Sequence, residues 1–296
     1  MFTGPVRYFD CFTSKPGGGN AVAIVTDASG MDASAMQTAA SDIGTPATCF
    51  LERVEADCVH ARFFSPRSEY KMCGHAVIGL FTMLLQDQHI APGAHLSLAT
   101  PGRISPVYVE ILGKRSPRIM LELALPTFYP SGVKSTEITE LLKIPLQALS
   151  RPYPVQVAEA DFRQLLVPLA GPGELSQIVP NFLDIAAFCK ARQIDSVAAF
   201  SPPEPNVPNN YKIREFCPAI GVDESAAAGT TNATVSCYLA AQGALTGHDQ
   251  MTVHTTAHQG AEVGRPSVIH SELRFDGRQI VGVRTGGTAV ETNRLS

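Results

Sequence analysis

The chain has 296 residues, 45% of them hydrophobic and 17% charged, which suffices for two modest domains or one large one with a sizeable core. Its net charge of −4, the absence of tryptophan and the lack of a basic block argue against a nucleic-acid surface. No apolar run of about 18 residues and no leader-like start occur, so neither a membrane span nor a secretory signal is expected. Seven scattered cysteines without a CxxC pair indicate reduced thiols and a cytoplasmic protein.

The first part of the chain predicts short strands around one helix. A strand at 4–14 and a turn at KPGGGN (15–20) lead to a buried strand at 21–27. Residues 31–44 predict a helix, with Asp32 near its start and Gly44 after its end. The segments TCFLERV and CVHARFFSP then resemble the two strands of a hairpin.

An almost unbroken apolar run begins at Cys73-Gly74-His75. HAVIGLFTMLLQ has no polar stripe, and a helix that is apolar nearly all round is buried in a core. Strands are predicted in HLSLATP, ISPVYVEIL and RIMLELAL. The stretch 129–154 is richer in Pro, Ser and Lys, so we expect it to carry the link between two halves.

The second half repeats features of the first. Strands at 155–170 and 196–203 enclose a predicted helix at 181–193. REFCP then echoes RFFSP, and each ends a strand at a proline. The loops that follow lead to CGHAVIGLFTMLL and AGTTNATVSCYLAA, each a small residue, a glycine, a polar residue and a buried-type helix, with Gly243 ending the second. We interpret this as a duplication with domains at 1–115 and 116–296, the C-terminal strand returning to either one.

The glycine at each helix start predicts a binding site. A helix N-terminus has unsatisfied N–H groups and a partial positive charge, and a glycine there lets a ligand approach the backbone. Two such termini that face each other across a domain cleft are expected to hold a small carboxylate. Cys73 and His75 at one terminus, and Thr230 and Thr231 at the other, would then carry out the chemistry.

Four motifs together resemble one known family. They are YFDCFTSKPGGGNAVAIVTDA, RFFSPRSEYKMCGHAVIG, FCPAIGVDESAAAGTTNA and HQGAEVGRPSVI. Each is similar to a segment of the phenazine-biosynthesis PhzF-like proteins, which are relatives of diaminopimelate epimerase and proline racemase. The matches extend over nearly the whole chain.

The resemblance implies an α+β fold of two similar domains, each a strongly curved sheet or barrel around a central helix. It implies proton transfer on small carboxylic acids without a cofactor, often with movement of a double bond, and usually a homodimer. Nucleic-acid and membrane partners are not expected.

The departures from the family pattern concern its catalytic groups. Ala47 stands where the resemblance places a catalytic glutamate, and Ser225 stands where it places an aspartate. Thr230 replaces a serine after the glycine. In the racemase branch two cysteines face each other, whereas here the second thiol position is Ala228. Neither the glutamate mechanism nor the two-thiol mechanism transfers intact.

The candidate residues each have a structural alternative. His75 is the predicted proton carrier or else a capping residue, and Cys73 is a thiolate base, activated by the helix N-terminus, or else a packed thiol. The predicted substrate-binding residues are Asn20, Gly74, Glu224, Ser225, Gly229, Thr230 and Thr231. Their alternatives are turn formation for Asn20, a solvated loop charge for Glu224 and ordinary helix capping for the glycines and threonines.

The predicted function is an isomerase. It moves a proton or a double bond on a small unsaturated carboxylic or cyclic amino acid in a specialised-metabolite pathway, for example one that makes alkylated proline units. The alternatives are a PhzF-like metabolite-binding protein that has lost catalysis and, less favoured, a racemase or epimerase. His248, His254 and His258 do not predict a metal site, because HExxH is absent and no other ligand completes a set.

Overall fold

The computed structural model describes residues 2–111, 117–247 and 251–293, and they form two compact units. Unit 1 comprises residues 1–122 and 286–296, and unit 2 comprises residues 123–285. The C-terminal end of the chain therefore belongs to unit 1, where its last strand pairs with the first strand of the chain. His248 and the very end of the C-terminal segment lie outside the described residues.

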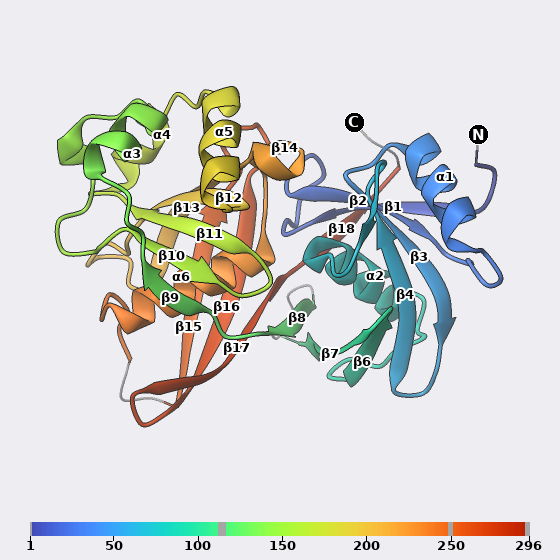
Figure 1. The fold of residues 1–296 in the computed structure, drawn as a ribbon. Helices are drawn as coiled ribbons and strands as arrows, with labels where there is room; N and C mark the ends of the chain where they lie inside the picture. The colour runs from blue at the N-terminus through green and yellow to red at the C-terminus, as the bar shows by residue number, and fades with distance from the viewer. Residues whose placement is uncertain (1, 112–116, 248–250, 294–296) are drawn as a thin grey trace. The chain divides into compact units, whose positions relative to one another are not determined.

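Unit 1 consists of β-strands around one central helix (Figure 1). Its strands are β1 (Val6–Cys11), β2 (Asn20–Val25), β3 (Ala47–Val54), β4 (Cys58–Phe64), β5 (Glu69–Tyr70), β6 (His95–Thr100), β7 (Arg103–Glu110), β8 (Arg118–Leu123) and β18 (Ala289–Thr292). Its helices are α1 (Ala33–Ile43) and α2 (Gly74–Gln86). Asp32 caps the N-terminus of α1 and Gly44 ends the helix at φ 76°, which confirms both predictions.

The apolar helix α2 packs against β1, β2, β3 and β18. Residues Ala76 to Leu84 are all buried, as the missing polar stripe predicted. Gly79 allows this close packing, because a Cβ at this position would lie 2.7 Å from Val22 Cγ1 and 3.2 Å from Cys11 Sγ. The core of unit 1 therefore fixes the position of the first turn of α2.

Unit 2 has the same kind of architecture (Figure 1). Its strands are β9 (Thr127–Pro130), β10 (Gln156–Glu159), β11 (Arg163–Pro168), β12 (Ser196–Ser201), β13 (Asn210–Cys217), β14 (Val222–Ser225), β15 (Thr252–Gln259), β16 (Ser267–Asp276) and β17 (Gln279–Gly287), which ends two residues into unit 1. Its helices are α3 (Ser135–Leu142), α4 (Pro172–Gln177), α5 (Phe182–Arg192) and α6 (Gly229–Ala241).

The strand pairings repeat from one unit to the other. In unit 1, β1 and β2 are antiparallel, β2 and β3 parallel, β3 and β4 antiparallel, and β4 and β6 parallel. In unit 2 the pairs β10–β11, β11–β12, β12–β13 and β13–β15 follow the same sequence of directions. The helices α2 and α6 each have 13 residues and stand at the same place in this order. The α+β class and the duplication are confirmed.

The prediction that residues 129–154 link the two halves is wrong. These residues form the second half of β9 and all of α3, and they belong to unit 2. Ile138 and Leu142 lie one helical turn apart and are buried in a core cluster with Val157 and Ile185. The Pro, Ser and Lys content suggested a link, but the apolar spacing within the stretch is that of a packed helix.

Candidate functional site

The first helix mouth is formed by Cys73, Gly74 and His75 in unit 1. Cys73 is the N-cap residue of α2, with extended backbone at φ −141° and ψ 96°, and makes no side-chain capping hydrogen bond within the described chain. Cys73 is buried, whereas Gly74 and His75 are half-buried. The first N–H groups of α2 therefore retain hydrogen-bonding capacity for a ligand.

Cys73 and His75 lie against each other at this mouth. The distance from Cys73 Sγ to His75 Nδ1 is 3.5 Å. Burial raises the pKa of Cys73 to about 12 and lowers the pKa of His75 to about 4. The shift for the thiol is opposite to the one expected from a helix N-terminus, because loss of hydration outweighs the helix dipole. Near pH 7 the pair is thus a neutral thiol beside a neutral imidazole, and the imidazole is the stronger base.

Open space beside Gly74 allows a direct test of whether a ligand approaches the backbone there. A Cβ added to Gly74 would meet no described atom within 4 Å, its own chain neighbours and helix backbone aside. We expect Gly74→Ala to keep or slightly raise the melting temperature, because alanine favours helix and fits without a clash. It should raise KM for a carboxylate substrate at least tenfold, because the methyl group covers the N–H groups.

Gly173 provides the matched control for this change. It lies in the first turn of α4, and a Cβ there also meets no described atom within 4 Å. Gly173→Ala should leave both stability and KM unchanged. Equal kinetics for the two variants would show that ligands do not approach the backbone at Gly74.

The second helix mouth lies in unit 2, where α6 begins at Gly229 after its N-cap residue Ala228. Ala228 occupies in α6 the place that Cys73 occupies in α2, so this mouth has no thiol. Gly229 and Thr231 are buried, and Thr230 is half-buried. Thr230 O accepts a hydrogen bond from Thr234 Oγ1 at 3.1 Å.

Gln259 fixes the loop before α6, and sequence reasoning assigned it no role. Its Oε1 accepts hydrogen bonds from Ala228 N at 3.3 Å and from Asn232 Nδ2 at 2.8 Å. Its Nε2 donates to Ser225 O at 2.8 Å. The motif HQGAEVGRPSVI therefore contributes a side chain that ties β14 to the first turn of α6. In the sequence, the position of Gln259 within this motif was the signal that could have pointed to it.

Three other predicted residues have partners of their own. Glu224 forms a buried ion pair with Arg214, with Nε–Oε1 and Nη2–Oε2 distances of 2.8 Å. Ser225 pairs with Glu215 in the β13–β14 ladder. Asn20 begins β2 and pairs with Cys11 of β1. The substrate-binding roles of Asn20, Glu224 and Ser225 stay predictions.

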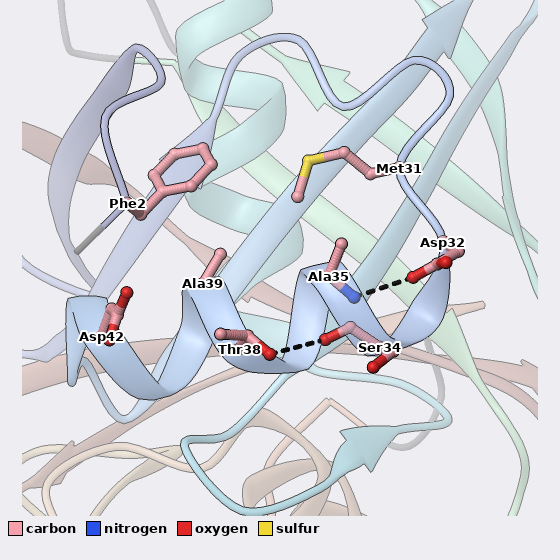
Figure 2. Close-up of a pocket in the computed structure, with 8 residues that line it drawn as sticks. All are labelled: Phe2, Met31, Asp32, Ser34, Ala35, Thr38, Ala39 and Asp42. Atoms are coloured by element: carbon pink, nitrogen blue, oxygen red, sulfur yellow. Dashed lines mark hydrogen bonds between the residues drawn. The ribbon is translucent and has the colours of Figure 1, made fainter.

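A separate surface cavity of about 570 Å³ lies over α1 (Figure 2). It is lined by Phe2, Met31, Asp32, Ser34, Ala35, Thr38, Ala39 and Asp42. None of the predicted site residues contributes to it.

Two negative findings apply to the described part of the chain. No three His, Cys, Asp or Glu side chains gather there in a metal-binding arrangement. His254 and His258 both lie on the exposed side of β15. None of the helices described has both the length and the apolarity required to cross a membrane.

Comparison with known proteins gives the same family along nearly the whole chain. The model of the phenazine biosynthesis-like protein family, PhzC-PhzF, matches residues 9–294. An uncharacterized isomerase of Deinococcus radiodurans is 28% identical, with 98% of this chain and 94% of the relative covered. The trans-2,3-dihydro-3-hydroxyanthranilate isomerase of Pseudomonas chlororaphis is 25% identical, with 96% of each chain covered.

The fold agrees with a solved structure of that family. The phenazine biosynthesis protein of Bacillus anthracis, of the PhzF family, superposes with a TM-score of 0.88 at 22% identity, over 98% of this chain and 97% of that one. The match over residues 9–294 shows that the chain belongs to the phenazine biosynthesis-like protein family, PhzC-PhzF, and that it is an isomerase.

Proposed function

We propose that the chain moves a proton, and with it a double bond, on a small unsaturated carboxylic acid or cyclic amino acid without a cofactor. The observation that supports this most is the mouth of α2. It combines uncapped helix N–H groups, open space at Gly74 and a neutral imidazole at His75. In this proposal, the anion-binding group and the base are neighbours in the first turn of α2.

The proposed mechanism uses only groups of the chain. The substrate carboxylate accepts hydrogen bonds from the first N–H groups of α2, where the helix dipole favours negative charge. His75 removes a proton from a carbon next to the conjugated system, and the enolate-like species is stabilised by the same N–H groups. The proton then returns at another carbon of the conjugated system. The buried thiol of Cys73 remains protonated and packs against the imidazole.

The substrate class follows from chemistry and from one relative. The Pseudomonas chlororaphis relative is named for a hydroxylated dihydro derivative of anthranilate, which is a cyclic unsaturated amino acid. We propose a substrate of this general type in a specialised-metabolite pathway, with alkylated proline units as one candidate product class. We also propose that the protein acts in the cytoplasm as a homodimer, with Asn20, Ser225, Gly229, Thr230 and Thr231 near the substrate.

Solvent isotope exchange tests the proposed function. The protein is incubated in D2O with trans-2,3-dihydro-3-hydroxyanthranilate or with a dehydroproline, and NMR and mass spectrometry follow deuterium in the recovered acid. We expect incorporation of deuterium at a carbon together with a shifted double bond. Binding of both acids by calorimetry without any exchange would favour the metabolite-binding alternative. Exchange with inversion of configuration and no double-bond shift would favour a racemase, although Ala228 leaves the α6 mouth without a thiol.

A further inference from the structure

A buried polar cluster lies under the first turn of α6. It comprises Gln164 of β11, Ser196 of β12, Glu215 of β13 and Thr231 of α6. Each of these residues is at most 5% exposed. Glu215 Oε1 accepts from Thr231 Oγ1 at 2.6 Å, from Ser196 Oγ at 3.1 Å and from Gln164 Nε2 at 3.1 Å. Gln164 Nε2 also lies 2.6 Å from Thr231 Oγ1.

The duplicated fold shows that packing does not require this cluster. In the β3–β4 ladder of unit 1 Cys49 pairs with Phe63, and in the β12–β13 ladder of unit 2 Ala198 pairs with Glu215. Continuing this register to the neighbouring strand and helix gives the unit 1 counterparts of the cluster. In the order of Gln164, Ser196, Glu215 and Thr231 they are Val22, Ala47, Phe63 and Ala76. All four counterparts are apolar and 0% exposed.

The carboxyl group of Glu215 has no neutralising charge in the cluster. Its described hydrogen-bond partners are two hydroxyls and one amide, all of them neutral. The adjacent Arg214 is bound to Glu224. Burial accordingly raises the pKa of Glu215 above its usual range, and the three donors offset only part of that rise.

The same carboxyl group is directed at the start of α6. Thr231 is the third residue of the helix, so its own N–H is one of those without an intrahelical partner. Among the described residues, no hydrogen bond reaches the second carboxyl oxygen of Glu215, Oε2. Glu215 is only 5% exposed, and its carboxyl group therefore contacts the first turn of α6 from within the core of unit 2, through Thr231.

We propose that Glu215 is a positioning residue that couples anion binding at the N-terminus of α6 to the uptake of one proton. The proposal rests on the carboxylate-binding role proposed above for the helix mouths. An ionised Glu215 and a ligand carboxylate would compete for the same positive end of α6, so the like charges disfavour each other. When the ligand carboxylate binds, the Glu215 carboxylate accepts a proton from solvent and becomes a neutral carboxyl group. When the ligand leaves, that proton returns to solvent.

The expected pH dependence follows from this balance. Above the pKa that Glu215 has in the free protein, each bound anion requires one proton, so Kd should rise about tenfold per pH unit. Below that pKa, Glu215 is already neutral and Kd should be independent of pH. Glu215→Gln imitates the neutral form with nearly the same shape. It should bind the anion at every pH as tightly as the parent does at low pH.

Other titratable groups on the strands and the helix around Glu215 do not account for such a pH dependence of Kd. They are Arg163 and Asp195 near β11 and β12, Tyr211, Lys212, Arg214 and Cys217 on β13, and Asp223 and Glu224 on β14. The titratable residues of β15 and β16 stand at positions that alternate with the buried ones; they are His254, His258, His270, Glu272, Arg274 and Asp276. Lys212 is exposed, and burial raises the pKa of Tyr211. Arg214 is paired with Glu224, and Asp195 accepts from Arg163 N at 2.8 Å. Cys217 stays a neutral thiol because burial raises its pKa. β12 itself and the first turn of α6 carry no titratable side chain.

Isothermal titration calorimetry tests the proposal on the full chain. The probes are 3-hydroxyanthranilate, which is aromatic and cannot shift a double bond, and inorganic sulfate as a second anion. Titrations from pH 5 to 9 in buffers of different ionisation enthalpy give both Kd and the number of protons taken up. Ser196→Ala is the matched variant, because it keeps the carboxyl group but removes one donor to it. Its rise in Kd should begin at a higher pH than in the parent.

The outcomes separate this inference from the proposed function. Proton uptake on binding in the parent and its loss in Glu215→Gln support the coupling. Binding without proton uptake, or the same uptake in Glu215→Gln, overturns the coupling but leaves the proposed function standing. Failure of both anions to bind the parent overturns the anion site at α6 and the coupling with it, while deuterium exchange at the α2 mouth still decides the isomerase.

Discussion

Replacing His75 by alanine is expected to lower turnover by about 10²–10⁴, the usual contribution of a well-placed general base. His75 is half-buried at the start of α2 and neutral near pH 7, so it can accept a proton without prior deprotonation. KM should change little, because the N–H groups proposed to bind the carboxylate belong to the backbone. Steady-state kinetics on the substrate identified by isotope exchange measure both quantities.

The pH profile provides a second measurement on the parent protein. Burial lowers the pKa of His75 from 6.5 to about 4, and a base works only when it is unprotonated. We therefore expect kcat/KM to show no fall near pH 6.5 and to decline only as the pH approaches 4. The sign for stability is the same, because the unfolded chain binds this proton near pH 6.5 and the folded chain only near pH 4. The contribution of His75 to stability is complete above pH 6.5 and is lost as the pH falls toward 4.

Cys73→Ser is the control for the imidazole. Burial raises the pKa of Cys73 to about 12, so almost no thiolate exists near pH 7. Turnover should therefore fall by less than about tenfold. If Cys73→Ser is as damaging as His75→Ala, the thiol carries the proton; if neither variant is impaired, the base lies elsewhere in the protein.

The sequence predicted the parts of the fold that repeat or that lack polar residues. The helix at 75–86 has no polar stripe, and this alone indicates a helix at the centre of a sheet. The echo between REFCP and RFFSP indicates two strands at equivalent positions, and the register of β4 and β13 agrees with it. These predictions succeeded because they depend on local pattern and on comparison of the chain with itself.

The site was less predictable, because its properties depend on burial and on distant partners. A helix N-terminus favours a thiolate, but burial of Cys73 raises the pKa of its thiol and keeps it protonated. Nothing near Glu224 in the sequence indicates that Arg214 holds it in a buried pair. Glu215 was visible in principle, since the echo places a glutamate where the first copy has Phe63. The strand register of unit 2 is needed to show that Gln164 and Ser196, which are far from Glu215 in the sequence, lie next to it and supply its hydrogen bonds.

The second large effect is expected at the ion pair of unit 2. Glu224→Gln should lower the free energy of unfolding by about 3–5 kcal/mol, because it leaves the Arg214 guanidinium buried without a counter-charge. The two side chains are 6% and 4% exposed. Arg214 also donates to Leu175 O at 3.0 Å and to Ile178 O at 2.9 Å, so its displacement would disturb the end of α4. Urea denaturation of the two proteins measures the difference.

The duplicated fold supplies the matched control for this prediction. In unit 1, Arg62 binds Glu69 at 2.7 and 2.8 Å, and each arginine lies over the phenylalanine two residues later, Phe64 or Phe216. The unit 1 pair is more accessible, with side chains 18% and 32% exposed, so solvent screens its charges. Glu69→Gln should therefore cost no more than about 1 kcal/mol.

The same pair of variants decides between two roles for Glu224. If the carboxylate serves the fold, Glu224→Gln destabilises the protein far more than Glu69→Gln, and the folded fraction keeps its KM. If it serves the substrate, KM rises while the two variants have similar unfolding free energies. We expect the first result, because both carboxylate oxygens of Glu224 already accept hydrogen bonds from Arg214, and a ligand that recruited them would have to break a buried, bidentate contact.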